Sequence, residues 1–247
     1  MNTAPTAAQR SAELSERLAG VRARIESAPD RSGEPTLIVV TKYFPASDVE
    51  LLAGLGVRHV GENKDQEAAA KAAELAGLDL TWHFIGQLQS NKAKSVVRYA
   101  AAVHSVDRMS LVTALGKAMT AEQERRTRAG LPQRAPLDCF VQVDLRSDGG
   151  GDGRGGALPA DIPALADAVA AHAELRLAGL MAVAPLHGDA GEAFGRLADL
   201  SARLTSGHPG ATAISAGMSG DLEQALAHGA THLRIGSDIL GPRPAVR

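Results

Sequence analysis

Apolar residues recur at helical spacing near the beginning of the chain. Between residues 6 and 28, four of them lie three or four positions apart among Arg, Glu and Ala residues: Leu14, Leu18, Val21 and Ile25. This spacing places one apolar stripe along a helix and leaves the opposite face polar. The pattern predicts an N-terminal helix over residues 6–28 that packs against the rest of the protein.

After residue 36, short apolar runs alternate with longer, alanine-rich stretches. Eight runs are strand candidates, and they begin at residues 37, 59, 82, 101, 137, 175, 211 and 232. Strands that alternate with helices are typical of βα units and a parallel sheet. The chain has 247 residues, and a (β/α)8 barrel needs roughly 250.

The fold class expected from this pattern is α/β, namely a single (β/α)8 TIM-type barrel with an extra N-terminal helix. Residues 1–247 would form one barrel domain. An open doubly wound sheet is the alternative, because periodicity does not reveal whether the first and last strands pair. The length of the chain and the number of units favour closure.

The composition excludes several classes of protein. Hydrophobic residues make up 45% of the chain and the formal net charge is -2, so there is no basic excess for binding nucleic acid. The single cysteine, Cys139, cannot form an intramolecular disulfide, and its apolar neighbours predict a buried, inert thiol. Neither a signal peptide nor a long apolar run is visible, so we expect a cytoplasmic protein without membrane spans.

A glycine-rich segment follows the fifth strand candidate. Six glycines lie between Arg146 and Pro159, and GDGRGG at 151–156 satisfies the pattern G-x-G-x-x-G. A dinucleotide site needs its glycines directly after the strand, whereas RSDGG intervenes here. We therefore interpret residues 146–159 as a mobile loop at the functional rim of the barrel.

Lys42 ends the apolar run LIVVT of the first strand candidate. Ser47 and Glu50 have the spacing of a capping box, which predicts that the next helix starts there and that Lys42 lies at the strand exit. An apolar environment favours the neutral form of an amine, which can attack an aldehyde and give a Schiff base. The alternative is a lysine that extends to solvent or pairs with a carboxylate such as Glu62.

The loops after the last two strand candidates read SAGMSGD and RIGSD. Barrels commonly bind a phosphate in the loops after strands seven and eight. Ser215, Gly217 and Ser219 offer hydroxyl and backbone N–H groups near the start of a helix, and Gly236 and Ser237 can complete the site. Alternatively, Ser219 is only a helix N-cap and the glycines are turn residues.

These residues carry a resemblance to a known family. The matching segments, in chain order, are VTKYFPASDV, VGEN, WHFIGQLQSNK, GLMAVAP, SAGMSGDLEQAL and RIGSDILGPR. The chain resembles the pyridoxal phosphate homeostasis proteins, whose fold is similar to the N-terminal barrel of alanine racemase. The resemblance implies that pyridoxal 5′-phosphate (PLP) is held as a covalent aldimine on Lys42, in a single PLP-binding domain.

The resemblance also implies the other site residues. Arg234 would contact the cofactor, at the phosphate or at the pyridine nitrogen, and Asn63 and His83 would flank the ring. For His83 a hydrogen-bonded core position is the alternative. The phosphate pocket would be lined by Ser215, Met218, Ser219, Gly236 and Ser237, with Gly217 beside them. A departure from the family pattern is Lys64, which follows GEN where an aromatic residue is common.

The expected function is that of a carrier rather than an enzyme. A PLP enzyme also supplies an acid or base to the reacting carbon, and neither Tyr43 nor Tyr99 is a convincing acid. We expect a monomeric protein that holds PLP and supplies it to apo-enzymes, with no metal. The alternatives are a PLP-dependent amino-acid racemase or lyase, and a barrel that binds a sugar phosphate.

Overall fold

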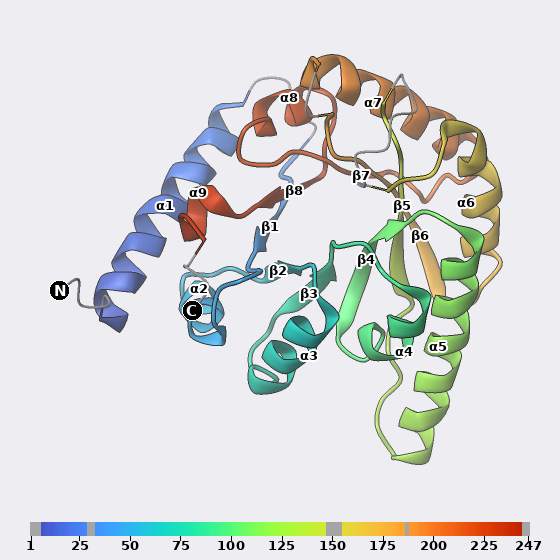
Figure 1. Ribbon diagram of the computed structural model, residues 1–247, viewed down its shortest axis with the longest axis horizontal. Coiled ribbons are helices and arrows are strands. Elements are labelled where there is room, and N and C mark those ends of the chain that lie inside the picture. The colour runs from blue at the N-terminus through green and yellow to red at the C-terminus, as the bar shows by residue number, and fades with distance from the viewer. Residues whose placement is uncertain (1–5, 29–32, 147–154, 186–187, 244–247) are drawn as a thin grey trace.

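The computed structural model describes residues 6–28, 33–146, 155–185 and 188–243 (Figure 1). Eight parallel strands form a closed barrel in chain order. The strands are β1 Thr36–Val40, β2 His59–Glu62, β3 Thr81–Phe84, β4 Ala100–Val106, β5 Leu137–Gln142, β6 Leu175–Met181, β7 Ala213–Ser215 and β8 His232–Ile235. The helices are α1 Ala7–Ser27, α2 Ala46–Gly54, α3 Asp65–Glu74, α4 Ala93–Val96, α5 Met109–Arg128, α6 Ile162–Ala170, α7 Ala190–Gly207, α8 Leu222–Ala227 and α9 Ser237–Leu240.

The first and last strands pair, which confirms the predicted barrel and shows that the open-sheet alternative is wrong. Val39 of β1 is in register with Val60 of β2 on one side and with Ile235 of β8 on the other. Closure brings the ends of β1 and β8 together. Residues that are far apart in the sequence therefore share one rim of the barrel.

Helix α1 lies outside the barrel, as the sequence predicted, and packs against α9 and α2 (Figure 1). Its four predicted apolar residues are all buried. The helix begins with a capping box, because Thr6 accepts a hydrogen bond from the Gln9 N–H and the Gln9 side chain accepts one from Thr6. Near its end, the Arg24 guanidinium binds Glu223, Asp238 and the Ser219 carbonyl, so α1 supports the loops after β7 and β8.

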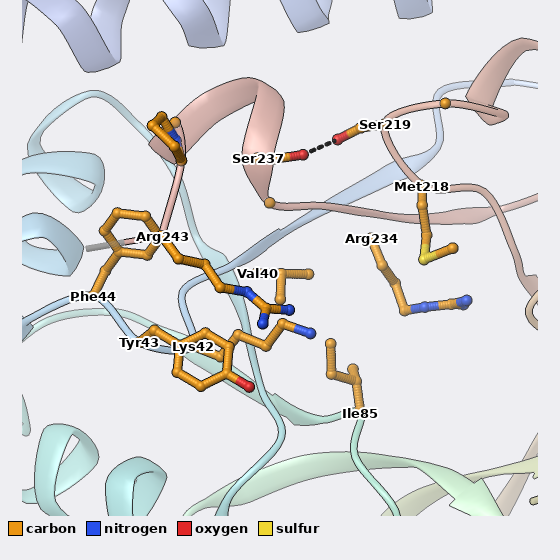
Figure 2. A pocket seen from close by; sticks show the side chains of 14 residues that line it. Val40, Lys42, Tyr43, Phe44, Ile85, Met218, Ser219, Arg234, Ser237 and Arg243 are labelled. Atoms are coloured by element: carbon orange, nitrogen blue, oxygen red, sulfur yellow. Dashed lines mark hydrogen bonds between the residues drawn. The ribbon is translucent and has the colours of Figure 1, made fainter. Parts of the chain in front are cut away.

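The predicted capping box at Ser47 and Glu50 is wrong. Helix α2 begins at Ala46 with Pro45 as its N-cap, and no side chain caps it. Ser47 therefore lies inside the first turn, and Asp48 binds Arg10 of α1 instead. Lys42 nevertheless lies at the exit of β1, where it enters a pocket at the carboxyl end of the barrel (Figure 2).

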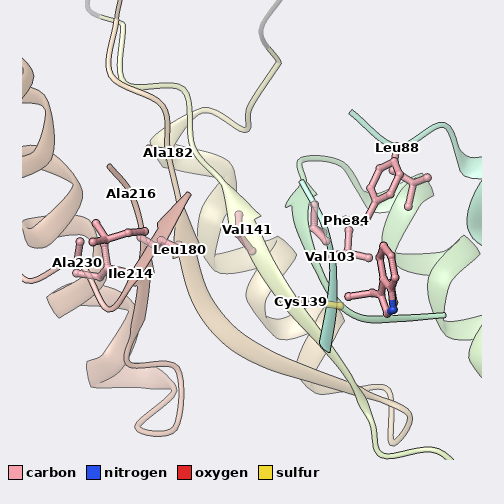
Figure 3. Packing of buried hydrophobic residues seen from close by; sticks show 14 of the residues in the cluster. Phe84, Leu88, Val103, Cys139, Val141, Leu180, Ala182, Ile214, Ala216 and Ala230 are labelled. Carbon is pink, nitrogen blue, oxygen red and sulfur yellow. The ribbon is translucent and has the colours of Figure 1, made fainter. Parts of the chain in front are cut away.

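The main hydrophobic core lies between the strands and the surrounding helices. Val103, Cys139, Val141 and Leu180 are fully buried members of it (Figure 3). Burial raises the pKa of the Cys139 thiol, in agreement with an inert cysteine. Residues at alternate strand positions form a separate, smaller cluster around Phe140, as expected when successive side chains point to opposite faces.

Most of the predicted glycine-rich loop, residues 147–154, lies outside the described residues. The two ends of the loop are adjacent, because Val143 and Ala157 form an isolated parallel bridge. Within the described ranges, none of the helices combines the length and the apolar character that a membrane crossing requires.

Candidate functional site

A cavity of about 390 Å³ opens at the carboxyl ends of β1 and β8. Six of the residues predicted from the sequence line it together: Lys42, Met218, Ser219, Arg234, Gly236 and Ser237. Tyr43 and Arg243 line its mouth, and Val40 and Ile85 contribute apolar wall. The volume lies within the roughly 300–1,000 Å³ of small-molecule sites.

Lys42 points from the end of β1 into this cavity, toward Ile85 and Arg234 (Figure 2). Its side chain is half-buried. Glu62, the carboxylate considered as its partner, accepts hydrogen bonds from Thr41 and Lys71 instead. The structure therefore presents the Lys42 amine to the cavity, where it can react with an aldehyde.

Tyr43 has an unusual backbone conformation, with a φ of 70° in the left-handed region. In the described part of the chain it is the only residue other than glycine with a positive φ. Three cations surround its exposed ring, with Lys42, Lys64 and Arg243 at 5.9, 5.3 and 4.6 Å from the ring centroid. The face of the aromatic ring attracts these cations, and their three positive charges make the mouth of the cavity electropositive.

The loops after β7 and β8 form the opposite wall. The Ser237 hydroxyl donates a hydrogen bond to the Ser219 hydroxyl at 3.2 Å, which joins the two loops (Figure 2). A Cβ atom on Gly236 would lie 3.3 Å from the Val40 carbonyl oxygen, so glycine permits the close approach of β8 to β1. Hydroxyls and accessible backbone on one wall suit an anionic group.

Ser219 is not the N-cap of α8. That helix begins at Leu222, with Asp221 at the N-cap position. The Asp221 carboxylate accepts a hydrogen bond from the Met218 N–H at 2.5 Å. The Ser219 hydroxyl is therefore not used to cap the helix and faces Ser237 and the cavity.

Arg234 is a buried cation at the base of the cavity, with 5% of its surface exposed. Its Nη1 donates to the Ser215 hydroxyl at 2.6 Å and its Nη2 to the Ala182 carbonyl at 2.8 Å. Burial lowers its pKa to about 10, which still leaves it charged at neutral pH. Among the described residues no carboxylate lies within ion-pair distance of this guanidinium. Since buried charges are normally paired, Arg234 is suited to an electron-rich ligand.

Below Arg234, histidines fill a part of the barrel interior that branched aliphatic residues usually occupy. His59 bonds His83 at 3.0 Å, His83 bonds His104 at 2.9 Å, and His104 bonds the Ser215 hydroxyl at 2.9 Å. Burial lowers the pKa of His83 to about 3 and that of His104 well below its usual range, so both are neutral. This histidine column connects through Ser215 to Arg234.

Four predicted site residues do not line the cavity. His83 and Ser215 belong to the histidine column, and His83 thus has the hydrogen-bonded core position considered as its alternative. Gly217, with a φ of 90°, accepts a hydrogen bond through its carbonyl from the Arg234 N–H. Asn63 lines an adjacent cavity of about 510 Å³, together with Lys64 and Lys92.

Sequence reasoning missed the histidines around His83. His104 stacks on Phe140 with ring centroids 4.2 Å apart, and His232 lies 5.2 Å from the same ring. Burial lowers the pKa of His232 to about 4. Strand alternation could have placed these side chains inside the barrel, but it could not show that they bond one another.

In the described ranges no group of His, Cys, Asp or Glu side chains is arranged to hold a metal ion.

A family model described as "Alanine racemase, N-terminal domain" matches residues 17–244. The "Pyridoxal phosphate homeostasis protein" of Mycobacterium tuberculosis (strain ATCC 25618 / H37Rv) is 40% identical to this chain, covering 95% of it and 94% of that relative. The protein of the same description from Escherichia coli (strain K12) is 35% identical, with 94% and 97% covered.

The chain is also similar to proteins of known structure. PipY of Synechococcus elongatus, a structure with PLP bound, matches with a TM-score of 0.76 and 33% identity, covering 92% of this chain and 100% of that one. Alanine racemase from Corynebacterium glutamicum matches with a TM-score of 0.69 at 12% identity, covering 95% of this chain and 62% of that one. The second match concerns the fold alone.

Proposed function

The chain belongs to the pyridoxal phosphate homeostasis protein family, and from this premise we propose that it binds PLP in the cavity between Lys42 and the loops after β7 and β8. The protein would hold the cofactor in reserve and supply it to apo-enzymes. The proposal rests mainly on the arrangement of one amine, one buried guanidinium without an ion-pair partner in the described part of the chain, and a wall of hydroxyls around a single cavity.

The residues present fit the chemical groups of PLP. When bound, PLP supplies an aldehyde that condenses reversibly with a primary amine. Lys42 is the primary amine that lines the cavity. Ser219, Ser237 and the backbone at Gly236 offer donors to the phosphate, and Arg234 offers a buried cation that forms no ion pair with a carboxylate of the described residues. Since Ser215 and Ala182 fix the guanidinium from the barrel interior, we assign Arg234 to the ring nitrogen rather than to the phosphate.

The remaining predicted residues are assigned supporting roles or stay predictions. Ser215 and Gly217 would act through Arg234, because each is hydrogen-bonded to it. Contacts of Asn63 and His83 with the ring remain predictions, as do the monomeric state and the cytoplasmic location.

A carrier role is supported by the kinds of side chain around the cavity. No histidine, aspartate or glutamate is found among the described residues that line it. A catalyst needs a general acid or base close to the reacting carbon, whereas a carrier needs only to hold and release the cofactor. Stopped-flow transfer of PLP to an apo-aminotransferase tests the proposal. Transfer that is faster than release into bulk solvent is expected, and transfer limited by that release contradicts direct delivery.

The alternative is a PLP-dependent amino-acid racemase or lyase. It is favoured by the position of Tyr43, whose ring lies at the mouth of the cavity, 5.9 Å from the Lys42 Nζ. Incubation with amino acids in deuterated water discriminates the two functions. Exchange of the α-hydrogen at enzymic rates, lost in Tyr43→Phe, would favour the enzyme. Exchange no faster than that caused by free PLP is the result that the carrier role predicts.

A further inference from the structure

A cluster of buried charges lies next to Lys42 on the outer face of the barrel. The Lys71 ammonium, in α3, donates hydrogen bonds to Glu62 Oε1 and Glu67 Oε1, both at 2.7 Å, and to the Thr41 carbonyl at 2.9 Å. Lys71 is 6% exposed and Glu62 is fully buried. Lysine and glutamate are rarely buried, so this cluster calls for an explanation.

The same cluster also binds Tyr43, the residue that follows Lys42. Glu67 Oε1 accepts a hydrogen bond from the Tyr43 N–H at 2.7 Å, as well as the one from Lys71. The Thr41 carbonyl belongs to the peptide group before the Lys42 Cα, and the Tyr43 N–H belongs to the peptide group after it. Both peptide groups that flank Lys42 are therefore held by charged side chains.

The conformation of Tyr43 shows why such support is needed. A φ of 70° is unfavourable for a residue with a Cβ, and such a conformation persists only where its surroundings fix it. Two hydrogen bonds provide this fixation: the Tyr43 N–H donates to Glu67, and the Phe44 N–H donates to the Thr41 carbonyl across the turn. Loss of the bond to Glu67 would leave only the backbone bond of the turn, so we expect the peptide after Lys42, and with it the direction of the lysine side chain, to be less firmly fixed.

The outer face of the neighbouring strands is otherwise aliphatic. Val39 and Val60 precede Thr41 and Glu62 by two positions, share their face, and belong to the main hydrophobic core. Packed apolar residues can commonly replace a buried ion pair without loss of stability. The charges at this position are therefore better explained by the two peptide groups that they hold than by stability.

We propose that Glu62, Glu67 and Lys71 form a positioning clamp that fixes the backbone on both sides of Lys42 and thereby aims its amine at the cofactor. The proposal rests on the proposed binding of PLP. In the clamp, Glu67 and Lys71 hold the two peptide groups directly, and Glu62 fixes Lys71 and the Thr41 hydroxyl. None of the three lines the cavity, so they act through Lys42.

The test compares two ligands that differ only at the reacting group. Pyridoxamine 5′-phosphate has the ring and phosphate of PLP but carries an amine in place of the aldehyde, so it cannot condense with Lys42. For Glu67→Ala we expect PLP affinity to fall about tenfold, the equivalent of one charge-assisted hydrogen bond, while pyridoxamine 5′-phosphate affinity stays within about twofold. Equal loss for both ligands, or no loss for PLP, would overturn the clamp.

Two further variants separate positioning from folding. Glu67→Gln keeps an acceptor for the Tyr43 N–H and should retain PLP affinity within about threefold of the wild type. Glu74→Ala, which changes an exposed glutamate at the end of the same helix, is the matched control and should change neither affinity. If Glu67→Gln loses as much PLP affinity as Glu67→Ala, the acceptor is not what matters and the proposal fails.

The backbone conformation of Tyr43 allows a rescue experiment. Glycine adopts a positive φ without strain, so Tyr43→Gly combined with Glu67→Ala should bind PLP more tightly than Tyr43→Ala combined with Glu67→Ala. Equal affinities of the two double variants would contradict a role for this turn. The wild-type protein is titrated alongside to separate the clamp proposal from the proposed binding of PLP. If the wild type does not prefer PLP over pyridoxamine 5′-phosphate, the proposed function itself is contradicted.

Discussion

On the β1 side of the cavity, one reactive amine is aimed by charged side chains that lie outside the barrel. On the β7–β8 side, hydroxyls, close backbone and the Arg234 guanidinium form a wall that faces the cavity directly. Formation of a covalent bond depends on the direction of the attacking atom, whereas an anion is bound by several donors that need not be aligned so closely. The contrast implies that changes on the β1 side affect PLP selectively. Changes on the β7–β8 side should weaken PLP and pyridoxamine 5′-phosphate alike.

The largest effect is expected from removing the amine. Lys42→Ala eliminates the covalent link but leaves the phosphate wall intact, so PLP affinity should fall about 100-fold or more, roughly 3 kcal/mol. Affinity for pyridoxamine 5′-phosphate should change by less than about threefold. Both affinities can be measured by equilibrium titration of tryptophan fluorescence or by calorimetry. A parallel collapse of the two would mean that Lys42 contributes to the site in some other way than through its amine.

The buried histidines near Arg234 should make the stability of the protein sensitive to acid. His83 and His232 are neutral in the folded protein, where burial lowers the pKa of each to about 3 and about 4. The unfolded chain binds protons at these residues near pH 6.5, so stability is full above that pH and falls as the pH decreases toward 4. For His232 alone, the free energy of unfolding should fall by about 3 kcal/mol when the pH is lowered past both pKa values.

Urea unfolding at several values between pH 7 and pH 4 measures this loss. His232→Phe removes one titrating group while keeping an aromatic ring beside Phe140, and it should flatten the dependence. A wild-type protein whose stability is constant across this range would show that the histidines are charged or accessible in the folded state.

Arg234→Met tests the ring side of the comparison. The loss of a charged hydrogen-bond donor should lower the affinity for PLP and for pyridoxamine 5′-phosphate by about tenfold to 100-fold each. Stability of the free protein should change little, because the substitution removes a buried cation that forms no ion pair with a carboxylate of the described residues. If only the affinity for PLP falls, Arg234 acts on the bond with the Lys42 amine and not on the ring.

The smallest effects are expected at the hydroxyl pair. Ser219→Ala and Ser237→Ala each remove one donor from the wall, and each should weaken both ligands by about threefold to tenfold, near 1 kcal/mol. Inorganic phosphate used as a competitor should lose affinity in the same proportion. If neither substitution changes phosphate competition, the anion is bound elsewhere.

The sequence predicted the β7–β8 side of the site better than the β1 side. Ser219, Gly236 and Ser237 lie in two short segments after the last strands, where barrels commonly bind a phosphate, and the structure brings them to one cavity. The fold could also be predicted from the sequence, since eight apolar runs with helical segments between them specify eight βα units. The capping box at Ser47 was wrong because Pro45 already sets the start of α2.

What the sequence could not show depends on contacts between distant segments. Glu67 and Lys71 have the spacing of an ordinary exposed helix pair, and nothing local indicates that they reach Thr41 and Tyr43. The positive φ of Tyr43 is likewise invisible, because tyrosine is not a residue that signals such a turn. Asn63, assigned to the ring by resemblance, lines the adjacent cavity, and its contact with the ring remains a prediction.

Borohydride reduction of the PLP-loaded protein, followed by peptide mass mapping, tests the central assignment most directly, because it fixes the cofactor to the amine that holds it. One pyridoxyl group is expected, located on Lys42. A label on Lys64 or Lys71, or a protein that takes up PLP without forming any reducible link, would contradict it.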